Sequence, residues 1–250
     1  FGERFDRFSS FLEERKEDQP FAYFYGAGEP HRPFSWQASL TSNLDLDSIR
    51  EPPYLPDNET TRTDLGDYYL KVEKLDLLAG EILTALEEAD ELENTIVVMT
   101  SDNGMAFPRA KATLYDAGCR IPLAIRWGEK IPGGRRIDDF VTLADLAPTF
   151  LEATGLAVPD TMTGRALLPA LRPETEESSF AARDHVILGM EQHVYPNPSR
   201  AIRTKDYLYI RNFAPEAWPT GKVDEEPRQF DFKATPWPTV PGAFSLNIDP

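Results

Sequence analysis

The sequence predicts an α/β fold in which helices sandwich a mostly parallel sheet, followed by a smaller C-terminal α+β part with a short antiparallel sheet. The run Thr95 to Met99 is β-branched and apolar without polar alternation, which is typical of a strand covered on both faces. A long amphipathic helix pattern precedes it, and short strand patterns follow the acidic stretch Pro173 to Ser179. We therefore expect one part at residues 1–175 and a second, incomplete part at residues 180–250.

The composition excludes several classes of protein. The chain has 250 residues, with 26 Lys+Arg against 42 Asp+Glu and a formal net charge of -16. This acidic balance argues against a general nucleic-acid binder, because few basic residues are available for phosphates. No apolar run reaches the roughly eighteen residues of a membrane span. The single cysteine, Cys119, excludes an intrachain disulfide.

The N-terminal segments predict a helix and a short strand. Residues 1–16 have an amphipathic helical pattern that ends before Gln19-Pro20. Phe21 to Tyr25 is short, aromatic and unbroken, which predicts a strand, and the glycines and prolines that follow place His31 at the strand exit. Residues 34–58 lack periodicity, which predicts a long loop.

The clearest pattern in the chain predicts a helix from Leu65 to Ala89. Its apolar residues recur at alternating intervals of three and four: Leu65, Tyr68, Val72, Leu75, Ala79, Ile82, Leu86 and Ala89. A coiled coil is the alternative, but the neighbouring strands favour the crossover helix of a βαβ unit. The flanking strands would then be parallel, and their carboxyl ends would bring His31 beside Asp102 and Asn103.

The remaining elements are a third strand, two helices and three short strands, the last two joined as a hairpin by Lys205-Asp206. They are expected at Ile121 to Trp127, at Leu146 to Thr154 and around Arg165 to Leu171, and at Asp184 to Met190, Ala201 to Thr204 and Tyr207 to Arg211. Asp145 can cap the first of these helices.

Polar residues follow the buried strand, at the sheet edge where α/β proteins bind ligands. Asp102 and Asn103 come first, and Lys111 follows within reach. A carboxylate, an amide and a lysine indicate a hard cation bound through oxygen, with a positive group beside it for an anionic substrate. The simpler interpretation is also open, because Asp-Asn-Gly is an ordinary turn sequence and a lone histidine such as His31 is more often structural or solvated.

These motifs resemble the type I sulfatases of the alkaline phosphatase superfamily. The resemblance rests on TSDNG, on the lysine that opens KATLYDAGCRIPLAIRW, on the Val-x-x-x-Asp-x-x-Pro-Thr helix from Val141 to Thr149, and on GEPHRPF upstream. The segment EQHVYPNPSRAIRTKDYLYIRNF resembles the C-terminal part of the N-sulfoglucosamine sulfohydrolase-like branch. The similarity runs over most of residues 20–212 and implies an alkaline phosphatase-like fold.

The resemblance implies a calcium-dependent hydrolase of sulfuric esters or N-sulfates on a sulfated sugar or glycan. Asp102 and Asn103 would be calcium ligands, Lys111 would hold the sulfate and assist the leaving group, and His31 would contact the sulfate or the leaving-group oxygen. The weaker candidates for sugar contacts are Glu29, Arg32, Glu191 and His193. The alternative for each of them is an ordinary surface residue.

The chain departs from the family at the nucleophile. The resemblance implies a formylglycine made from Cys or Ser in a Cys/Ser-x-Pro-x-Arg run, and no such run occurs here. Cys119 has proline at the third following position instead of the second, so we interpret it as a structural thiol. The family's paired N-terminal aspartates are also missing. We therefore expect a fragment whose nucleophile lies before Phe1, which alone would bind calcium weakly and not turn over substrate.

Two other functions remain open: a phosphodiesterase or phosphonate hydrolase of the same superfamily using another metal, and a sulfatase-like binding protein without catalysis. The expected partner is a sulfated carbohydrate, and the sequence leaves homo-oligomers open. By resemblance, the location would be exported (periplasmic or extracellular) or lysosomal. Because only local positive charge can attract a sulfate ester to an acidic protein, we expect Arg109, Lys111 and Arg120 to face one cleft with His31.

Overall fold

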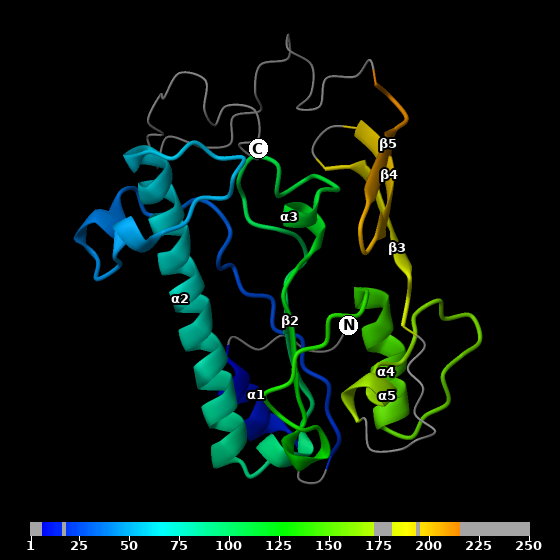
Figure 1. Ribbon diagram of the computed structural model, residues 1–250. Helices are drawn as coiled ribbons and strands as arrows, with labels where there is room; N and C mark the ends of the chain where they lie inside the picture. Colours follow the sequence, from blue (N-terminus) through cyan, green and yellow to red (C-terminus); the bar gives the residue numbers. More distant parts are fainter. Residues whose placement is uncertain (1–6, 17–18, 173–181, 194–195, 216–250) are drawn as a thin grey trace. The chain divides into compact units, whose positions relative to one another are not determined.

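A computed structural model describes residues 7–16, 19–172, 182–193 and 196–215 (Figure 1). The chain divides into two compact units. The first contains the described residues of Phe1–Glu93 and Asp102–Ile121, and the second contains those of Asn94–Ser101 and Pro122–Pro219. The predicted boundary between residues 175 and 180 stays a prediction, and residues 1–6 of the first predicted helix and 216–250 of the C-terminal part lie outside the described residues.

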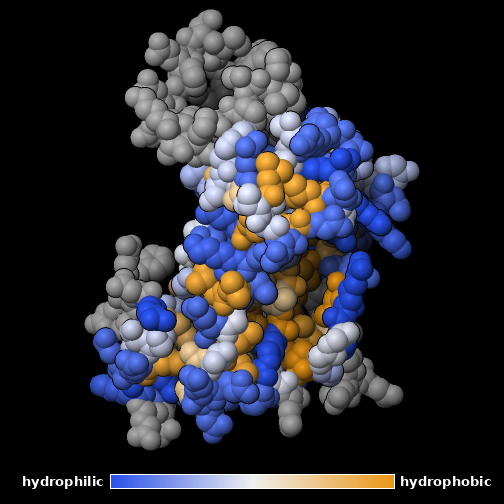
Figure 2. All heavy atoms as spheres, turned by 90° about the vertical axis from the view of Figure 1, so that its left-hand side faces the viewer, coloured by the Kyte–Doolittle hydropathy of each residue, from blue (hydrophilic) through white to orange (hydrophobic). Residues whose placement is uncertain are grey.

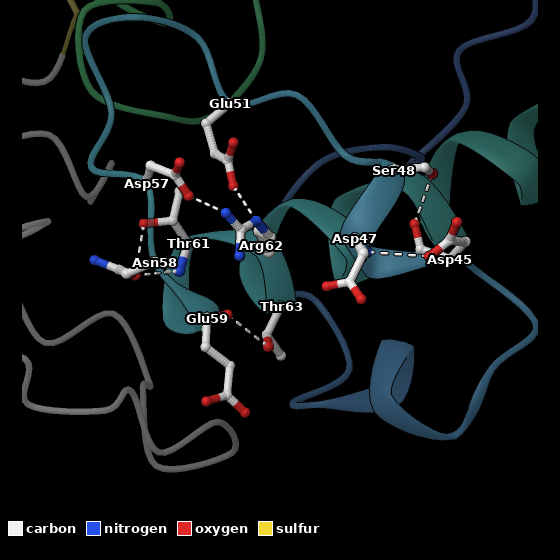
Figure 3. A network of polar contacts seen from close by, with 10 residues as sticks. All are labelled: Asp45, Asp47, Ser48, Glu51, Asp57, Asn58, Glu59, Thr61, Arg62 and Thr63. Carbon is white, nitrogen blue, oxygen red and sulfur yellow. Dashed lines mark hydrogen bonds and ion pairs between the residues drawn. The ribbon is translucent and has the colours of Figure 1, made fainter.

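The first unit is built on the long helix α2, Glu59–Glu88 (Figure 1). The helix was predicted, but it begins earlier than Leu65 because its first turns are polar. Asn58 caps it, since its side chain accepts a hydrogen bond from the Thr61 backbone N–H at 2.9 Å. Arg62 then forms ion pairs with Glu51 and Asp57, which fix the preceding loop (Figure 3).

Short elements and loops complete the first unit. They are α1 (Phe8–Glu14), the 3-10 helices η1 (Ala38–Thr41) and η2 (Leu46–Ser48), η3 (Leu92–Asn94) at the unit's end, and α3 (Asp116–Cys119). The predicted loop at 34–58 is held against α2 by the buried Asp67, which accepts backbone hydrogen bonds from Gln37 and Ser39, both at 2.8 Å. The core of this unit contains Phe34, Leu55, Leu65 and Phe107.

The predicted strand at Phe21 to Tyr25 is wrong. This segment forms no strand, and its alternate rings pack against α1 instead: the centroid of Tyr23 lies 4.9 Å from that of Phe8, and that of Phe21 lies 5.5 Å from that of Phe11. Phe24 is 88% exposed. The segment thus buries one side by ring packing, without a partner strand.

The second unit contains two antiparallel sheets. Strands β1 (Val97–Thr100) and β2 (Leu123–Arg126) form the first, with Val97 opposite Arg126. Strands β3 (His185–Gln192), β4 (Pro196–Thr204) and β5 (Leu208–Asn212) form the second, in that order (Figure 1). The three C-terminal strands and their hairpin are confirmed. The mostly parallel sheet and the βαβ crossover are not found among the described residues, because β1 and β2 pair in opposite directions.

The helices of the second unit are α4 (Leu146–Ala153) and α5 (Leu168–Leu171), with 3-10 turns η4 (Gly128–Lys130) and η5 (Leu143–Asp145). Both predicted helices are thus confirmed, the second in shortened form. The core of this unit contains Trp127 and Ile131. They pack with three leucines at α5, namely Leu167, Leu168 and Leu171. On the face drawn in Figure 2, hydrophobic side chains lie among hydrophilic ones.

A buried carboxylate ties α4 to distant segments. Asp145 is fully buried and accepts two hydrogen bonds from the Arg183 guanidinium, at 2.7 and 2.6 Å, and others from the backbone N–H groups of Thr142 and Arg165. Burial alone would raise the pKa of Asp145, but the hydrogen bonds from Arg183 and the two backbone groups outweigh it and lower the pKa. The Asp of the Val-x-x-x-Asp-x-x-Pro-Thr motif is therefore a structural hub.

We expect Asp145→Asn to lower the free energy of unfolding by about 3–5 kcal/mol, because it leaves the Arg183 charge without its partner. Asp138→Asn is the control, since Asp138 pairs with Arg136 in an exposed ion pair, and it should cost about 1 kcal/mol or less. Urea denaturation measures both. Equal losses would contradict the role of Asp145.

The same carboxylate predicts an acid-labile unit. Because the pKa of Asp145 is lowered in the folded state, its stabilising contribution is present above the unfolded value of about 3.9 and is lost as the pH falls through the folded-state pKa. The difference in stability between the wild-type chain and Asp145→Asn should therefore shrink below about pH 4. A difference that stayed constant from pH 7 to below that value would contradict this.

Candidate active site

His31 and Lys111 lie in direct contact in the first unit. Lys111 Nζ is 3.0 Å from His31 Nε2, although the two residues come from loops far apart in the sequence. His31 is exposed and Lys111 is half-buried. This contact agrees with the expectation that Lys111 faces His31, whereas the place of His31 beside Asp102 and Asn103 and the chemical roles of all four residues stay predictions.

The hydrogen bonds of His31 define its tautomer. Its Nδ1 contacts the backbone carbonyl oxygen of Arg32, which can only accept a hydrogen bond, so Nδ1 carries a proton. In the neutral imidazole, Nε2 then presents its lone pair to the Lys111 ammonium group. The pair can therefore share a proton between His31 Nε2 and Lys111 Nζ.

The loop before Lys111 is folded back on itself. The Lys111 and Phe107 backbone N–H groups both donate to the Met105 carbonyl, at 3.0 and 2.8 Å. Arg109 and Ala112, on either side of Lys111, have left-handed backbones with φ of 62° and 60°. Non-glycine residues rarely adopt this conformation, and such strain is typical of functional sites.

Gly104 allows the start of this loop to approach α3. A Cβ at Gly104 would lie 1.9 Å from the Ala117 carbonyl oxygen, and the Gly104 N–H donates to the Gly118 carbonyl at 2.9 Å. The glycine of Asp-Asn-Gly is thus required by the close approach of the two backbones.

The two predicted metal ligands precede Gly104. Asp102 is exposed and Asn103 is half-buried. Both side chains have oxygen atoms that can bind a metal ion. The Asp102 carboxylate forms no hydrogen bond or ion pair with a residue that the structure describes. Within the described ranges, no group of three His, Cys, Asp or Glu side chains could hold a metal ion. A cation here would need ligands from other sources.

Arg32 is held by the protein and is mostly buried. Its guanidinium binds both carboxylate oxygens of Asp64, at 3.1 and 2.7 Å, and its Nε donates to the Ala106 carbonyl at 3.0 Å. It also lies over the rings of Phe34 and Phe107, at 4.1 and 4.9 Å from their centroids. The sequence alone did not single out Asp64, because its pairing with Arg32 is long-range and it sits in the polar first turns of α2.

Glu29, the second upstream candidate for a sugar contact, is bound to α2. Its carboxylate accepts a hydrogen bond from Lys74 at 2.5 Å and lies 3.6 Å from Lys71 Nζ. The hydrogen bond from Lys74 is the main reason that the pKa of Glu29 is lowered, against the opposing effect of burial. Together, Glu29 and Arg32 attach the loop on both sides of His31 to one helix.

The other candidates have different surroundings. In the second unit, Glu191 forms an ion pair with Arg200, and His193 is exposed. In the first unit, the Arg109 guanidinium lies 4.6 Å from the centroid of the Tyr115 ring, and Arg120 is exposed. Of the three predicted basic residues, Lys111 is shown in contact with His31, and the shared cleft stays a prediction.

Cys119 has the properties of a structural thiol. Its Sγ donates to the Thr113 carbonyl at 3.3 Å. Burial, with a smaller effect of Asp116, raises the pKa of Cys119, so the thiol stays protonated at neutral pH. This agrees with its interpretation as a non-catalytic residue.

We expect Gly104→Ala to destabilise the first unit by about 1–3 kcal/mol, because the added methyl group must displace the Ala117 backbone. Gly26→Ala is the control, since a Cβ there has no neighbour within 4 Å, and it should change stability by about 0.5 kcal/mol or less. Urea denaturation compares them, and equal stabilities would refute the need for close approach.

Comparisons with known proteins show which family the chain is similar to. The family model described as Sulfatase matches residues 3–156, and the one described as N-sulphoglucosamine sulphohydrolase, C-terminal, matches residues 109–232. An ulvan-active sulfatase of Formosa agariphila is 32% identical over 77% of this chain and 31% of its own length. The human N-sulphoglucosamine sulphohydrolase is 30% identical over 71% of this chain and 36% of its own length. The chain thus spans about a third of the length of these curated relatives.

Solved structures share the fold. A structure from work on glycosaminoglycan metabolism by Bacteroides thetaiotaomicron superimposes with a TM-score of 0.66 at 24% identity, over 79% of this chain and 46% of the other. A phosphonate monoester hydrolase from Silicibacter pomeroyi superimposes with a TM-score of 0.52 at 21% identity, over 70% and 38%. No helix in the described ranges is long and apolar enough to cross a membrane. The Sulfatase family model matches well over half of the residues of this chain, so the chain belongs to the sulfatase family.

Proposed function

We propose that this chain is the part of a sulfatase that holds the sulfate group and protonates the leaving atom, which is oxygen in a sulfuric ester and nitrogen in an N-sulfate. The contact between Lys111 Nζ and His31 Nε2 carries the proposal, because it joins a cation and a proton-transfer group at one point of an otherwise acidic protein. The reaction would be hydrolysis of a sulfuric ester or N-sulfate.

The chemistry of sulfate cleavage fits this pair. When the bond between sulfur and the bridging atom breaks, negative charge grows on the leaving atom, and the non-bridging oxygens stay negative. The Lys111 ammonium can donate hydrogen bonds to these oxygens, and its contact with His31 gives the leaving atom a route to a proton. The proton route stabilises charge that is larger in the transition state than in the substrate, and the hydrogen bonds from Lys111 hold the sulfate in place.

Calcium is the cofactor that we propose beside them. Asp102 and Asn103 fit a calcium ion in chemistry, since both donate oxygen, but they supply far fewer than the roughly six to eight oxygens that calcium takes. Calcium bound there would neutralise charge on the sulfate oxygens. The remaining ligands and the formylglycine nucleophile would come from outside this chain, whose sequence contains no Cys/Ser-x-Pro-x-Arg run.

A sulfated sugar or glycan is the substrate class that we propose. Its support lies in the relatives, which include the ulvan-active sulfatase, the N-sulphoglucosamine sulphohydrolase and a 29% identical protein solved with a glucosamine disulfate substrate at a TM-score of 0.50. An exported or lysosomal location is proposed from the family resemblance alone.

A phosphonate hydrolase is the second candidate, supported by the shared fold of the Silicibacter pomeroyi enzyme. Assays of a longer protein that includes this chain, with aryl sulfate and aryl phosphonate esters side by side, decide between the two. Preferential turnover of the phosphonate would overturn the sulfatase proposal. Turnover of neither ester or of any sulfated sugar would favour a binding protein.

We expect Lys111→Ala in such a longer, active protein to lower kcat by a factor of roughly a hundred or more, because charge stabilisation and a proton donor are lost together. Lys205→Ala is the control, since Lys205 is exposed in the turn between β4 and β5, and it should keep wild-type turnover. Near-normal turnover of a folded Lys111→Ala variant would remove the role of this lysine.

Calcium binding to this chain alone should be weak, with a Kd of about 1 mM or more, because Asp102 and Asn103 leave most ligand positions to other groups. Titration with calcium, followed by the amide NMR signals of these two residues, measures it. Asp102→Ala should abolish the signal changes. Submicromolar affinity of the isolated chain would contradict the need for outside ligands.

A further inference from the structure

We propose that Arg32 and Asp64 are positioning residues that fix the tautomer of His31 and its distance from Lys111. This inference rests on the proposed function, in which the His31 and Lys111 pair handles the proton. Neither Arg32 nor Asp64 would touch the substrate in this scheme, because their charged groups are engaged with each other and are only 12% and 13% exposed.

The first step links Arg32 to the imidazole. The Arg32 carbonyl oxygen accepts the Nδ1–H of His31, so the orientation of this one peptide group selects which ring nitrogen faces Lys111. The peptide group is held in turn by the Arg32 side chain, which Asp64 binds with two parallel hydrogen bonds.

The second step links Arg32 to the lysine. Its Nε donates to the Ala106 carbonyl, and its guanidinium covers the Phe107 ring. The neighbouring Met105 carbonyl accepts the Lys111 backbone N–H. One guanidinium therefore holds both loops, the one that carries His31 and the one that carries Lys111.

The third step concerns the helix that supports them. Asp64 and Lys71 are seven residues apart on α2, about 10 Å along its axis and on one face. Asp64 holds Arg32, while Lys71 and Lys74 hold Glu29, so His31 lies between two anchors on one rigid element. A rigid support of this kind is what a proton-transfer pair requires, since about 1 Å of misplacement can cost roughly a hundredfold in rate.

The test uses the ring nitrogen signals of histidine in this chain, which has only three histidines, His31, His185 and His193. At about pH 8.5 an ordinary imidazole is neutral, and the ¹⁵N shifts report its tautomer. The wild-type chain should show His31 with a protonated Nδ1 and an unprotonated Nε2. Asp64→Asn and Arg32→Lys should move the two shifts toward each other, because lysine and asparagine cannot form the two parallel hydrogen bonds.

The matched control is Arg62→Lys. Arg62 lies on the same helix and pairs with Glu51 and Asp57 (Figure 3), but neither partner contacts His31 in the described structure. In the Arg62→Lys variant, the His31 ring nitrogen signals should stay as in the wild type. The His185 and His193 signals should be unchanged in every variant. If Arg32→Lys does not fold, Asp64→Asn decides. Unchanged His31 shifts in folded Asp64→Asn would overturn the proposal.

A kinetic arm in a longer, active protein separates positioning from general stability. Asp64→Asn should lower kcat by roughly ten- to a hundredfold with little change in KM. In a His31→Ala background the same substitution should lower kcat by a smaller factor than in the wild type, because only the position of Lys111 can then be lost, whereas independent losses would multiply in full and overturn the proposal. The tautomer measurement requires no turnover, so it can fail while the sulfatase assignment holds, and the reverse also applies.

Discussion

The burial of the Arg32 guanidinium organises the first unit. A charge in a largely apolar environment is tolerated only when it is paired and hydrogen-bonded, and Arg32 meets this condition through Asp64, the Ala106 carbonyl and two aromatic faces. Phe34 and Phe107 belong to the apolar core of the unit. The residue next to His31 therefore packs against this core, and its contacts connect the site to the folded unit.

The second unit contains a comparable buried ion pair. Asp145 and Arg183 form a buried bidentate pair, and two backbone N–H groups complete the hydrogen bonding of the carboxylate. Both pairs join segments that are distant in sequence, so each reduces the freedom of a loop that secondary structure does not hold. The difference lies in the neighbours, because an exposed imidazole and a lysine adjoin Arg32, whereas Asp145 is surrounded by backbone groups and the core helix α4.

The local sequence pattern predicted α2 from its periodicity, α4 from its flanking residues, and β1 and the C-terminal strands from short runs, although β1 is only partly buried and not covered on both faces. It failed where a segment satisfies its burial in an unusual way. Phe21 and Tyr23 alternate like strand residues, but their rings pack on α1 and leave the backbone without a partner strand. The direction of strand pairing also escaped prediction, because an apolar run has the same composition in a parallel and in an antiparallel sheet.

The contact between His31 and Lys111 has another cause than the parallel strands that were expected to bring His31 beside Asp102 and Asn103, because such strands are not found among the described residues. Glycine-rich and proline-rich loops have no periodicity from which a tertiary position can be read, and the carboxylate that fixes this one, Asp64, looked like an ordinary charge at a helix start. The Arg32 side chain, bound by Asp64 and by the Ala106 carbonyl, brings the two loops together in place of a sheet edge, and we call this arrangement the Arg32 clamp. Such a clamp depends on only a few atoms, so a single substitution at Arg32 or Asp64 can separate the two loops while most of the core is kept.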